Sequence, residues 1–404
     1  MNQRLGRIGN AYDPELNLKP FQRRVHLILT FLFGVPFCIF QRLIFPIRLI
    51  RVGRINSLRI GHMLLEIDWY LSDVRKPSLD IFFFTTTTPV NSFLEDFAKR
   101  RMKYLPRIII FGAYIINRVI PGGSKYLVPL PLESFDFQIF DSSPSPFSST
   151  PDFTKLGAKL LQDMQISETS EIVCFYIRDE MYGEKTFPHL NQDFSKYRDS
   201  NIDDFQPAME FLANQGFTVI RMGREGKKPL SSKNPRVIDY CFSNFKSDFG
   251  DFYLTSKAKF AICTDTGMTH LPLFFRKPIG IANIVGMHGL LHTKMVRFIT
   301  FKRYFSNEKM QNLTLKEILN SPLLHFKDNN SFLNVGIEFI DSDPEELIGL
   351  AQDMMLNVQS TNLEKNSNTE LDARFQTLVY KKRGIEMLSR ISVNWLENNK
   401  DFLH

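Results

Sequence analysis

The 404-residue sequence predicts an α/β protein in which helices cover both faces of parallel sheets. Short apolar segments alternate with amphipathic segments along the second half of the chain, and this alternation is typical of a doubly wound parallel sheet. The apolar segments are not interrupted by regularly alternating polar residues, which is typical of strands that are covered on both faces. The chain is long enough for two or three domains and for a large core without disulfides.

The second half of the chain shows the alternation most clearly. Strands are expected at residues 171–178, 217–222, 236–239, 259–263 and 279–285, with helices at 152–164, 203–215, 248–256 and 269–275. Gly216 follows one of these helices, and glycine is the usual residue just past a helix end. A later helix is expected to start at Asp343, because Pro344 and Glu346 complete a strong start signal. A final helix is expected at 371–395.

The first half gives shorter signals. Strands are expected at 54–60, 79–84 and 135–140, and helices at 63–71, 90–101 and 107–120. Residues 141–151 are rich in serine and proline and are expected to form a linker or a long surface loop. The chain is therefore expected to have four parts: a basic and apolar N-terminal segment (1–53), an N-terminal domain (54–150), a C-terminal domain (151–345) and C-terminal helices (346–404).

Positive charge is concentrated at the start of the chain. The formal net charge is +7, but residues 1–60 carry ten lysines and arginines against two acids, a local balance of +8 that leaves −1 for the remainder. A nucleic-acid-binding domain would spread its basic residues over a folded face, whereas here they alternate with bulky apolar residues. The pattern predicts contact with an anionic membrane surface and no binding of nucleic acid.

The apolar run at 27–40 is the centre of this segment. Its 14 uncharged residues are fewer than the roughly 20 that span a bilayer. Pro36 and Pro46 are expected to kink any single helix. A helical anchor that lies in the membrane interface, peripheral or monotopic, is the favoured interpretation. A tilted single span, a signal peptide and a buried N-terminal helix pair are the alternatives.

The stretch from Cys263 to His270 (CTDTGMTH) is the best local signal for chemistry. A strand ends, a small polar loop follows and a helix begins, so amides at the helix start could bind a phosphate. Such sheets bind ligands at the carboxyl ends of their strands. The candidate binding residues are Asp265, Thr266, Gly267, Thr269 and His270. A plain helix cap by Asp265 or Thr266 is equally open, as is core packing for His270.

These motifs resemble a known family. The stretch from Thr264 to Asn283 is similar to the DTG-x-x-H region of the ADP-heptose:lipopolysaccharide heptosyltransferases. The wider stretch from Cys174 to Asn283 resembles a family of bacterial glycosyltransferases through four motifs: Arg178-Asp179, YRDS at 197–200, IRMG at 220–223 and SDFGDFYL at 247–254. In the first half the resemblance is weaker and rests on residues 59–63 and Glu66.

The resemblance implies a GT-B architecture. In that architecture two Rossmann-like domains with parallel sheets face a cleft, and the C-terminal domain holds most of a nucleotide-sugar donor. The donor is a substrate, so no cofactor is expected. GT-B enzymes commonly stabilise the leaving diphosphate with a cation and a helix N-terminus in place of a metal.

Three arginines stand where such a diphosphate would bind. Arg178 ends the strand expected at 171–178, Arg221 lies near the end of the next strand, and Arg224 lies just beyond it. Paired N–H donors on arginine can grip a diphosphate. We therefore expect these three side chains to contact the donor, while a surface salt bridge is the alternative for any one of them.

Sugar transfer to a hydroxyl needs a general base whose pKa lies near the working pH. His62 is the first candidate, because it follows Gly61 at the end of an expected strand. Glu66 lies four residues on and would share a helix face with His62, although a solvated surface position is its favoured interpretation. Asp179 is the candidate from the C-terminal domain.

Several other chemistries lack their motifs. No GxGxxG, GxxxxGK[ST], GxSxG or HExxH is present. Asp341 and Asp343 match the DxD of metal-dependent glycosyltransferases, but helix capping explains them better. The prediction is a metal-independent glycosyltransferase at the cytoplasmic face of a bacterial inner membrane, acting on a surface polysaccharide, lipopolysaccharide or glycolipid. A pyruvyl or polyol-phosphate transferase and a non-catalytic membrane-bound scaffold stay open.

Overall fold

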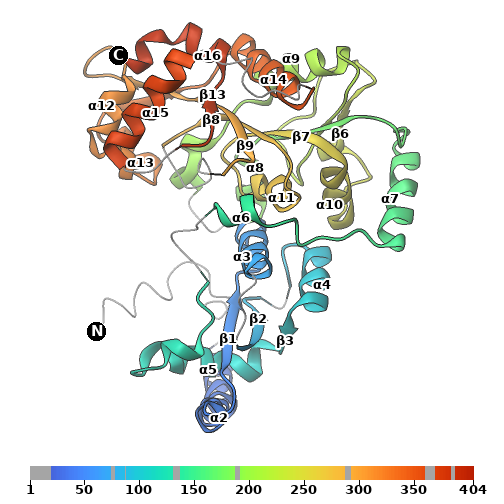
Figure 1. Cartoon of the computed structure of the whole chain (residues 1–404), viewed down its shortest axis with the longest axis vertical. Helices are drawn as coiled ribbons and strands as arrows, with labels where there is room; N and C mark the ends of the chain where they lie inside the picture. The colour runs from blue at the N-terminus through green and yellow to red at the C-terminus, as the bar shows by residue number, and fades with distance from the viewer. Residues whose placement is uncertain are drawn as a thin grey trace. The chain divides into compact units, whose positions relative to one another are not determined.

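The computed structural model describes residues 20–73, 78–86, 88–130, 137–186, 192–286, 293–359, 369–383 and 387–404. The chain divides into two compact units, Met1–Phe135 and Asp136–His404. Both units are mixed α/β structures built on parallel sheets (Figure 1).

The first unit is built on a three-stranded parallel sheet. Its strands follow the order β1 (Ile50–Ile55), β2 (Leu79–Phe84) and β3 (Lys103–Tyr104). The sheet is accompanied by α2 (Pro20–Ile44), α3 (Ile60–Ser72), α4 (Ser92–Arg101) and α5 (Arg107–Val119). Buried side chains of β1, β2 and α5 make a common core: Val52, Phe83, Ile110 and Tyr114.

Strand β1 begins at Ile50, so the strand expected at 54–60 is placed too late. Residues 50–53 of the predicted anchor therefore belong to the sheet. Gly53 fits there because a Cβ would lie 2.3 Å from the ring of Phe82 on the neighbouring strand. After Ile55 the chain turns directly into α3. Both IRVGRI and RINSLRI space their apolar residues like a strand, which is why the sequence alone does not separate them.

The second unit contains a seven-stranded sheet in which every pairing is parallel. The strand order is β13-β9-β8-β7-β4-β5-β6. The bounds are β4 (Ile172–Tyr176), β5 (Thr218–Arg221), β6 (Val237–Asp239), β7 (Ala258–Cys263), β8 (Ile279–Ile284), β9 (Val296–Phe301) and β13 (Arg390–Ile391). From β6 to β9 this is the strand order of the Rossmann fold, and the expected doubly wound parallel sheet is confirmed here.

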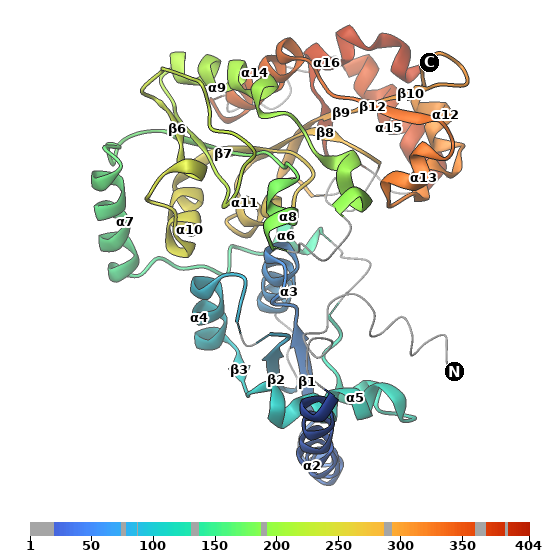
Figure 2. The same ribbon diagram turned by 180° about the vertical axis from the view of Figure 1, so that it is seen from behind.

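Helices cover both faces of this sheet. On one face α9 (Ile202–Asn214) and α14 (Pro344–Gln359) pack over the central strands, and their apolar side chains form a large buried core with them. On the other face lie α10 (Asp248–Lys257) and α11 (His270–Phe274), as Figures 1 and 2 show. The remaining helices of this unit are α6 (Ile139–Ser142), α7 (Pro151–Asp163), α8 (Met181–Thr186), α12 (Leu315–Leu319), α13 (Asn329–Leu333), α15 (Thr369–Arg383) and α16 (Val393–Asn398).

Two expectations for this unit are wrong. The single helix expected at 371–395 is α15, then β13, then α16, and β13 extends the main sheet by pairing with β9. Residues 139 and 140 of the strand expected at 135–140 belong to α6 instead, and residues 135 and 136 lie outside the described residues. Strand β9 was not predicted from the sequence. The same holds for a small antiparallel sheet made of β10 (Arg303–Ser306), β11 (Gln311–Asn312) and β12 (Ile337–Ile340).

The helix α2 is continuous through Pro36 and ends before Pro46. Within the part of the chain that the structure describes, no helix meets the length and apolarity needed to cross a membrane.

Candidate functional site

The strand order of the second unit places a topological switch point between β4 and β7. Strands β5 and β6 continue to one side of β4, whereas β7, β8 and β9 lie on the other. Open parallel sheets bind ligands outside the carboxyl ends of their strands at this point. The backbone amide of Arg178, just beyond β4, donates to the Thr264 hydroxyl, just beyond β7, at 2.9 Å. The two expected ligand-binding stretches therefore meet at this edge of the sheet.

Three cations gather around this edge, each paired with a carboxylate. The Arg178 guanidinium contacts Asp199 at 2.8 Å, as an ion pair rather than as an aligned hydrogen bond. Arg198 contacts the Asp265 carboxylate at 2.8 Å and donates to the Asp265 carbonyl at 2.8 Å.

The third cation comes from the strand beyond β8. Lys302 follows β9 directly and is almost fully buried. Its ammonium contacts the Asp341 carboxylate at 2.8 Å and donates to the Asp199 carbonyl at 2.5 Å. We call Arg178, Arg198 and Lys302 the cation cluster. The cluster thus draws on β4, on η3 (Gln192–Arg198) and on β9.

Burial shapes the electrostatics of the cation cluster. Desolvation lowers the pKa of Arg178, and the nearby positive charge of Arg198 lowers it further. Desolvation also raises the pKa of Asp199 from its ordinary value, against the opposing effect of Arg178. Two guanidinium groups held close together in a partly dry environment favour the approach of an anion. Such perturbed groups cluster at functional sites.

The turn after β7 is closed by its own side chains. The Thr266 hydroxyl accepts the Met268 amide at 3.4 Å, and the Thr266 carbonyl accepts the Thr269 amide at 3.1 Å. Thr266 is thus the cap of the short turn η5 (Gly267–Thr269), which is the alternative that the sequence left open. A phosphate would have to replace these bonds to reach the two amides, so their contact with a ligand stays a prediction. The His270 ring stacks on Phe137, with ring centroids 6.4 Å apart.

Arg221 has internal partners. Its side chain is 3% exposed, donates to the Lys228 carbonyl at 2.7 Å and contacts the Asp239 carboxylate at 3.3 Å. The guanidinium also lies 4.0 Å from Asp179. This arrangement favours a role in holding the loop after β5, and the predicted contact with a donor stays untested.

Asp179 and Arg224 also have protein partners. Asp179 accepts the backbone amides of Met181 at 3.1 Å and Lys227 at 2.9 Å. Arg224 pairs with Asp248 in the first turn of α10. Asn201 is the cap residue of α9 and accepts the Asp203 amide at 3.3 Å.

The candidates of the first unit lie on α3. His62 is exposed in the first turn of the helix, one turn before Glu66. Glu66 is 1% exposed and accepts the Asn56 amide at 2.6 Å, so its expected solvated position is wrong. Burial raises the pKa of Glu66 to about 7, despite the opposing effects of the Asn56 bond and of Arg54. The carboxyl group fixes the loop between β1 and α3.

A buried network that the sequence did not reveal supports the cation cluster. Asn283 in β8 has a φ of 55° and is fully buried. Its amide group donates to the Ser200 hydroxyl at 3.1 Å and accepts the Ser342 amide at 2.7 Å. These bonds hold the segments that carry Asp199 and Asp341. Asn283 is the last residue of the stretch that resembles the heptosyltransferases. Its place in that stretch was the one sequence feature that could have pointed to this network.

The DxD-like acids have other partners. Asp343 caps α14 by accepting the Glu346 amide at 2.8 Å, and Glu346 accepts the Asp343 amide at 3.0 Å. This reciprocal capping confirms the expected helix start. Asp341 pairs with Lys302. Among the described residues, no group of three or more His, Cys, Asp or Glu side chains has an arrangement that could hold a metal ion.

Comparisons with known proteins give weak structural likenesses. No family model and no curated protein matches the sequence. The chain is similar to the solved structure of E. coli ADP-heptose lipopolysaccharide heptosyltransferase II, with 9% identity, a TM-score of 0.35, and coverage of 57% of this chain and 84% of that chain. It is similar to a family 9 glycosyl transferase from Veillonella parvula, with 10% identity, a TM-score of 0.36, and coverage of 57% and 79%.

A third solved structure covers more of this chain. It is the dodecameric heptosyltransferase TibC in complex with ADP-D-beta-D-heptose, with 11% identity, a TM-score of 0.35, and coverage of 78% of this chain and 79% of that chain.

Proposed function

We propose that the protein is a GT-B glycosyltransferase that moves a sugar from a nucleotide-sugar donor to a glycan or glycolipid acceptor. The observation that carries this proposal is the cation cluster at the switch point of the second unit's sheet. A nucleotide-sugar carries a diphosphate, the ligand that closely spaced guanidinium groups recognise best. The sequence motifs at 178–179, 197–200 and 264–270 contribute Arg178, Arg198 and Asp265 to this one edge.

The proposed reaction is a displacement at the anomeric carbon of the donor sugar. The acceptor hydroxyl oxygen forms a bond to that carbon, and the carbon–oxygen bond to the nucleoside diphosphate breaks with its electron pair. The diphosphate gains negative charge as it leaves, and Arg178 and Arg198 would stabilise that charge. The hydroxyl proton passes to a general base, for which exposed His62 on α3 is the proposed residue and Glu66 and Asp179 are the further candidates.

Binding would exchange one set of ion pairs for another. In the ligand-free protein Asp199 and Asp265 neutralise the two arginines. A diphosphate would compete with these carboxylates for the same guanidinium groups. The cations would then be held in place before the donor arrives, so little reorganisation would accompany catalysis. We propose that this arrangement replaces a metal ion.

The function is tested with purified full-length protein and a panel of nucleoside diphosphates. The matching nucleotide is expected to raise the melting temperature, because a ligand of the folded state stabilises it by mass action. Hydrolysis of the corresponding nucleotide-sugar should then proceed in EDTA as in buffer. If no nucleoside diphosphate shifts the melting temperature, the donor site is misassigned. Binding without turnover would instead favour the scaffold, and transfer from a pyruvyl or polyol-phosphate donor would favour that reaction class.

The acceptor side of the proposal concerns the membrane. We propose that the enzyme works at the cytoplasmic face of a bacterial inner membrane, where surface polysaccharide, lipopolysaccharide or glycolipid precursors would meet it. The basic and apolar character of residues 1–60 supports this location.

A further inference from the structure

The helix α2 carries an unusual concentration of exposed apolar side chains. Among the described residues, 21 large apolar side chains are exposed, and ten of them fall between residues 28 and 47. Of these ten, the most exposed are Ile47 at 85%, just past the end of α2, Leu43 at 72% and Ile28 at 67%. A contiguous apolar surface of this kind marks a contact with a protein or a membrane.

The buried side of α2 is made of small and polar residues. Thr30, Gly34, Cys38 and Gln41 follow one another at helical spacing and are buried. A Cβ at Gly34 would lie 2.6 Å from the backbone of Gly112 on α5, so the two helices are in backbone contact.

Polar bonds complete this contact with α5. The Gln41 side chain accepts a hydrogen bond from Asn117 at 2.8 Å and donates to the Ile50 carbonyl at 3.0 Å. The helix is therefore fixed to the unit by small and polar residues and by Phe37, which packs against the core of the unit. Most of its other described apolar side chains are exposed, the reverse of the pattern in a soluble surface helix. Small residues at the helix contact allow the two backbones to approach closely.

Charge decides which partner fits this face. The sequence holds no acid between Glu15 and Glu66 or between Asp96 and Glu133, whereas these two stretches carry fifteen lysines and arginines. They contain α2, β1 and α5, together with β3 and the last turn of α4. Arg51 and Lys99 are paired with Asp80 and Glu95, which leaves an excess of positive charge. Two copies of such a surface would repel each other, so an anionic partner fits better than a second copy of the chain.

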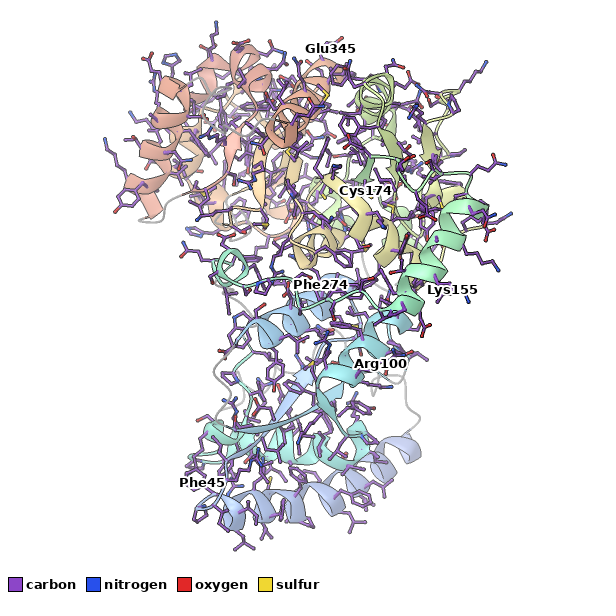
Figure 3. The ribbon with its side chains drawn as sticks, turned by 45° about the vertical axis from the view of Figure 1, so that its right-hand side comes forward. Phe45, Arg100, Lys155, Cys174, Phe274 and Glu345 are labelled. Atoms are coloured by element: carbon purple, nitrogen blue, oxygen red, sulfur yellow. The ribbon has the colours of Figure 1, made fainter. Side chains whose placement is uncertain are left out.

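Cations also border the apolar face directly. The Lys125 ammonium lies 3.7 Å from the centre of the Phe45 ring. Arg48, three residues after Phe45 in the chain, is exposed. Figure 3 labels Phe45 at the end of α2. Lysine and arginine that reach past apolar groups in this way can contact phosphates while the apolar groups enter the acyl region.

We infer that the outer face of α2, with Lys125 and Arg48 at its end, is a lipid-docking surface that binds the headgroup region of an anionic bilayer. The helix would lie in the plane of the interface, with its exposed apolar side chains among the acyl chains. This surface needs neither donor nor acceptor, so it stands independently of the proposed sugar transfer.

The test is flotation of the full-length protein with vesicles of phosphatidylcholine, with and without about 30% phosphatidylglycerol. The wild-type protein is expected to float with the anionic vesicles. A salt concentration of about 0.5 M should weaken this binding without abolishing it, because only the ionic part is screened. The triple variant Leu32→Ser, Ile39→Ser, Leu43→Ser should bind the anionic vesicles at least about tenfold more weakly.

A matched control replaces three exposed apolar residues of the second unit: Met310→Ser, Leu333→Ser, Val335→Ser. This control should float like the wild type, and both variants should keep the wild-type circular dichroism spectrum. The inference is overturned if the wild type stays in solution with anionic vesicles, or if a folded α2 triple variant floats as well as the wild type. Sedimentation as a dimer that the α2 substitutions dissociate would assign the face to a second copy and would also overturn it.

Discussion

Single residues of the cation cluster decide whether the proposed donor site is correct. Arg198→Gln removes a guanidinium that contacts Asp265 at the carboxyl edge of the sheet. Loss of a charge-assisted contact of about 1.5–3 kcal/mol should weaken nucleoside diphosphate binding by roughly one to two decades. Calorimetric titration of the full-length protein measures this change.

A control for Arg198 lies at the opposite edge of the same sheet. Arg236 comes just before β6 and donates to the Gly216 carbonyl at 2.9 Å. Arg236→Gln removes a charge from the amino edge and should leave the affinity unchanged. Equal affinity for Arg198→Gln and the wild type, both folded, would place the diphosphate elsewhere.

Arg221 is expected to matter for stability. Arg221→Met leaves the Asp239 carboxylate without its buried partner and should lower the free energy of unfolding by about 3 kcal/mol. Arg224→Met breaks a more exposed pair, in which the arginine side chain is 41% exposed, and should cost less than about 1 kcal/mol. Urea unfolding of the two variants compares them. Equal losses in the two variants would contradict the structural role of Arg221.

Glu66 should make the first unit more stable at acidic pH. Its pKa is about 7 when folded, against an ordinary value of 4.5. The folded state therefore binds more protons than the unfolded state between these values, and stability falls as pH rises from about 4.5 to 7. Glu66→Gln keeps an oxygen for the Asn56 amide but cannot ionise.

The comparison of melting temperatures at pH 5 and pH 8 tests this effect. Glu66→Gln should stabilise the protein at pH 8 by up to about 3 kcal/mol and much less at pH 5. A gain that is the same at both pH values would show that Glu66 does not titrate in this range. If Glu66 were instead the general base, the glutamine variant would lose turnover at a pH where its stability is improved.

At the scale of elements, local patterns predicted the interior of the second unit well. Strand β7 and helix α10 lie within a residue or two of the expected 259–263 and 248–256, because buried apolar runs and a serine cap mark them. β13 has only two residues, and pairing with the distant β9 creates it. Short strands that depend on such long-range pairing leave no local pattern in the sequence. Because β9 was not predicted, the position of Lys302 at its end could not be predicted either.

The contact between α2 and α5 gives a prediction at this scale. A Cβ at Gly112 would lie 1.9 Å from the Thr30 carbonyl oxygen, so Gly112→Val should separate the two helices. The variant is expected to melt at a lower temperature and to be cut by trypsin after Arg42, whose side chain bonds to Asn117 in the intact pair. Ile108→Val changes an exposed position on α5 and serves as the control. Wild-type protease resistance in Gly112→Val would show that the helices do not need this close approach.

At the scale of the whole molecule, the contact between α2 and α5 makes part of the N-terminal segment an integral part of the first unit. Its end enters β1, and its helix is bonded to α5. The sequence showed the charge and the apolar run, but it could not show that small residues fix one side of the helix to the protein. Removal of residues 1–52 would thus take away part of the first unit's sheet as well as the lipid-docking surface. Point substitutions on the outer face are the cleaner way to study membrane binding.

The second unit gives the last prediction, because it contains the whole cation cluster. It has its own seven-stranded sheet and its own buried core. A fragment of residues 136–404 should therefore fold alone and bind the nucleoside diphosphate within about threefold of the full chain's affinity, without transferring sugar. The C-terminal residues are needed, since the Trp395 ring packs against the Phe301 ring with centroids 5.9 Å apart and α14 supplies Leu350 to the core.

A fragment of residues 136–345 lacks these groups and serves as the matched control. It should fail to give a cooperative melting transition, because the faces that α14 and α16 cover would be exposed. Calorimetry measures nucleotide binding by each fragment, and thermal melting shows whether each fragment unfolds cooperatively. If the 136–404 fragment folds but does not bind the nucleotide, part of the donor site must come from the first unit.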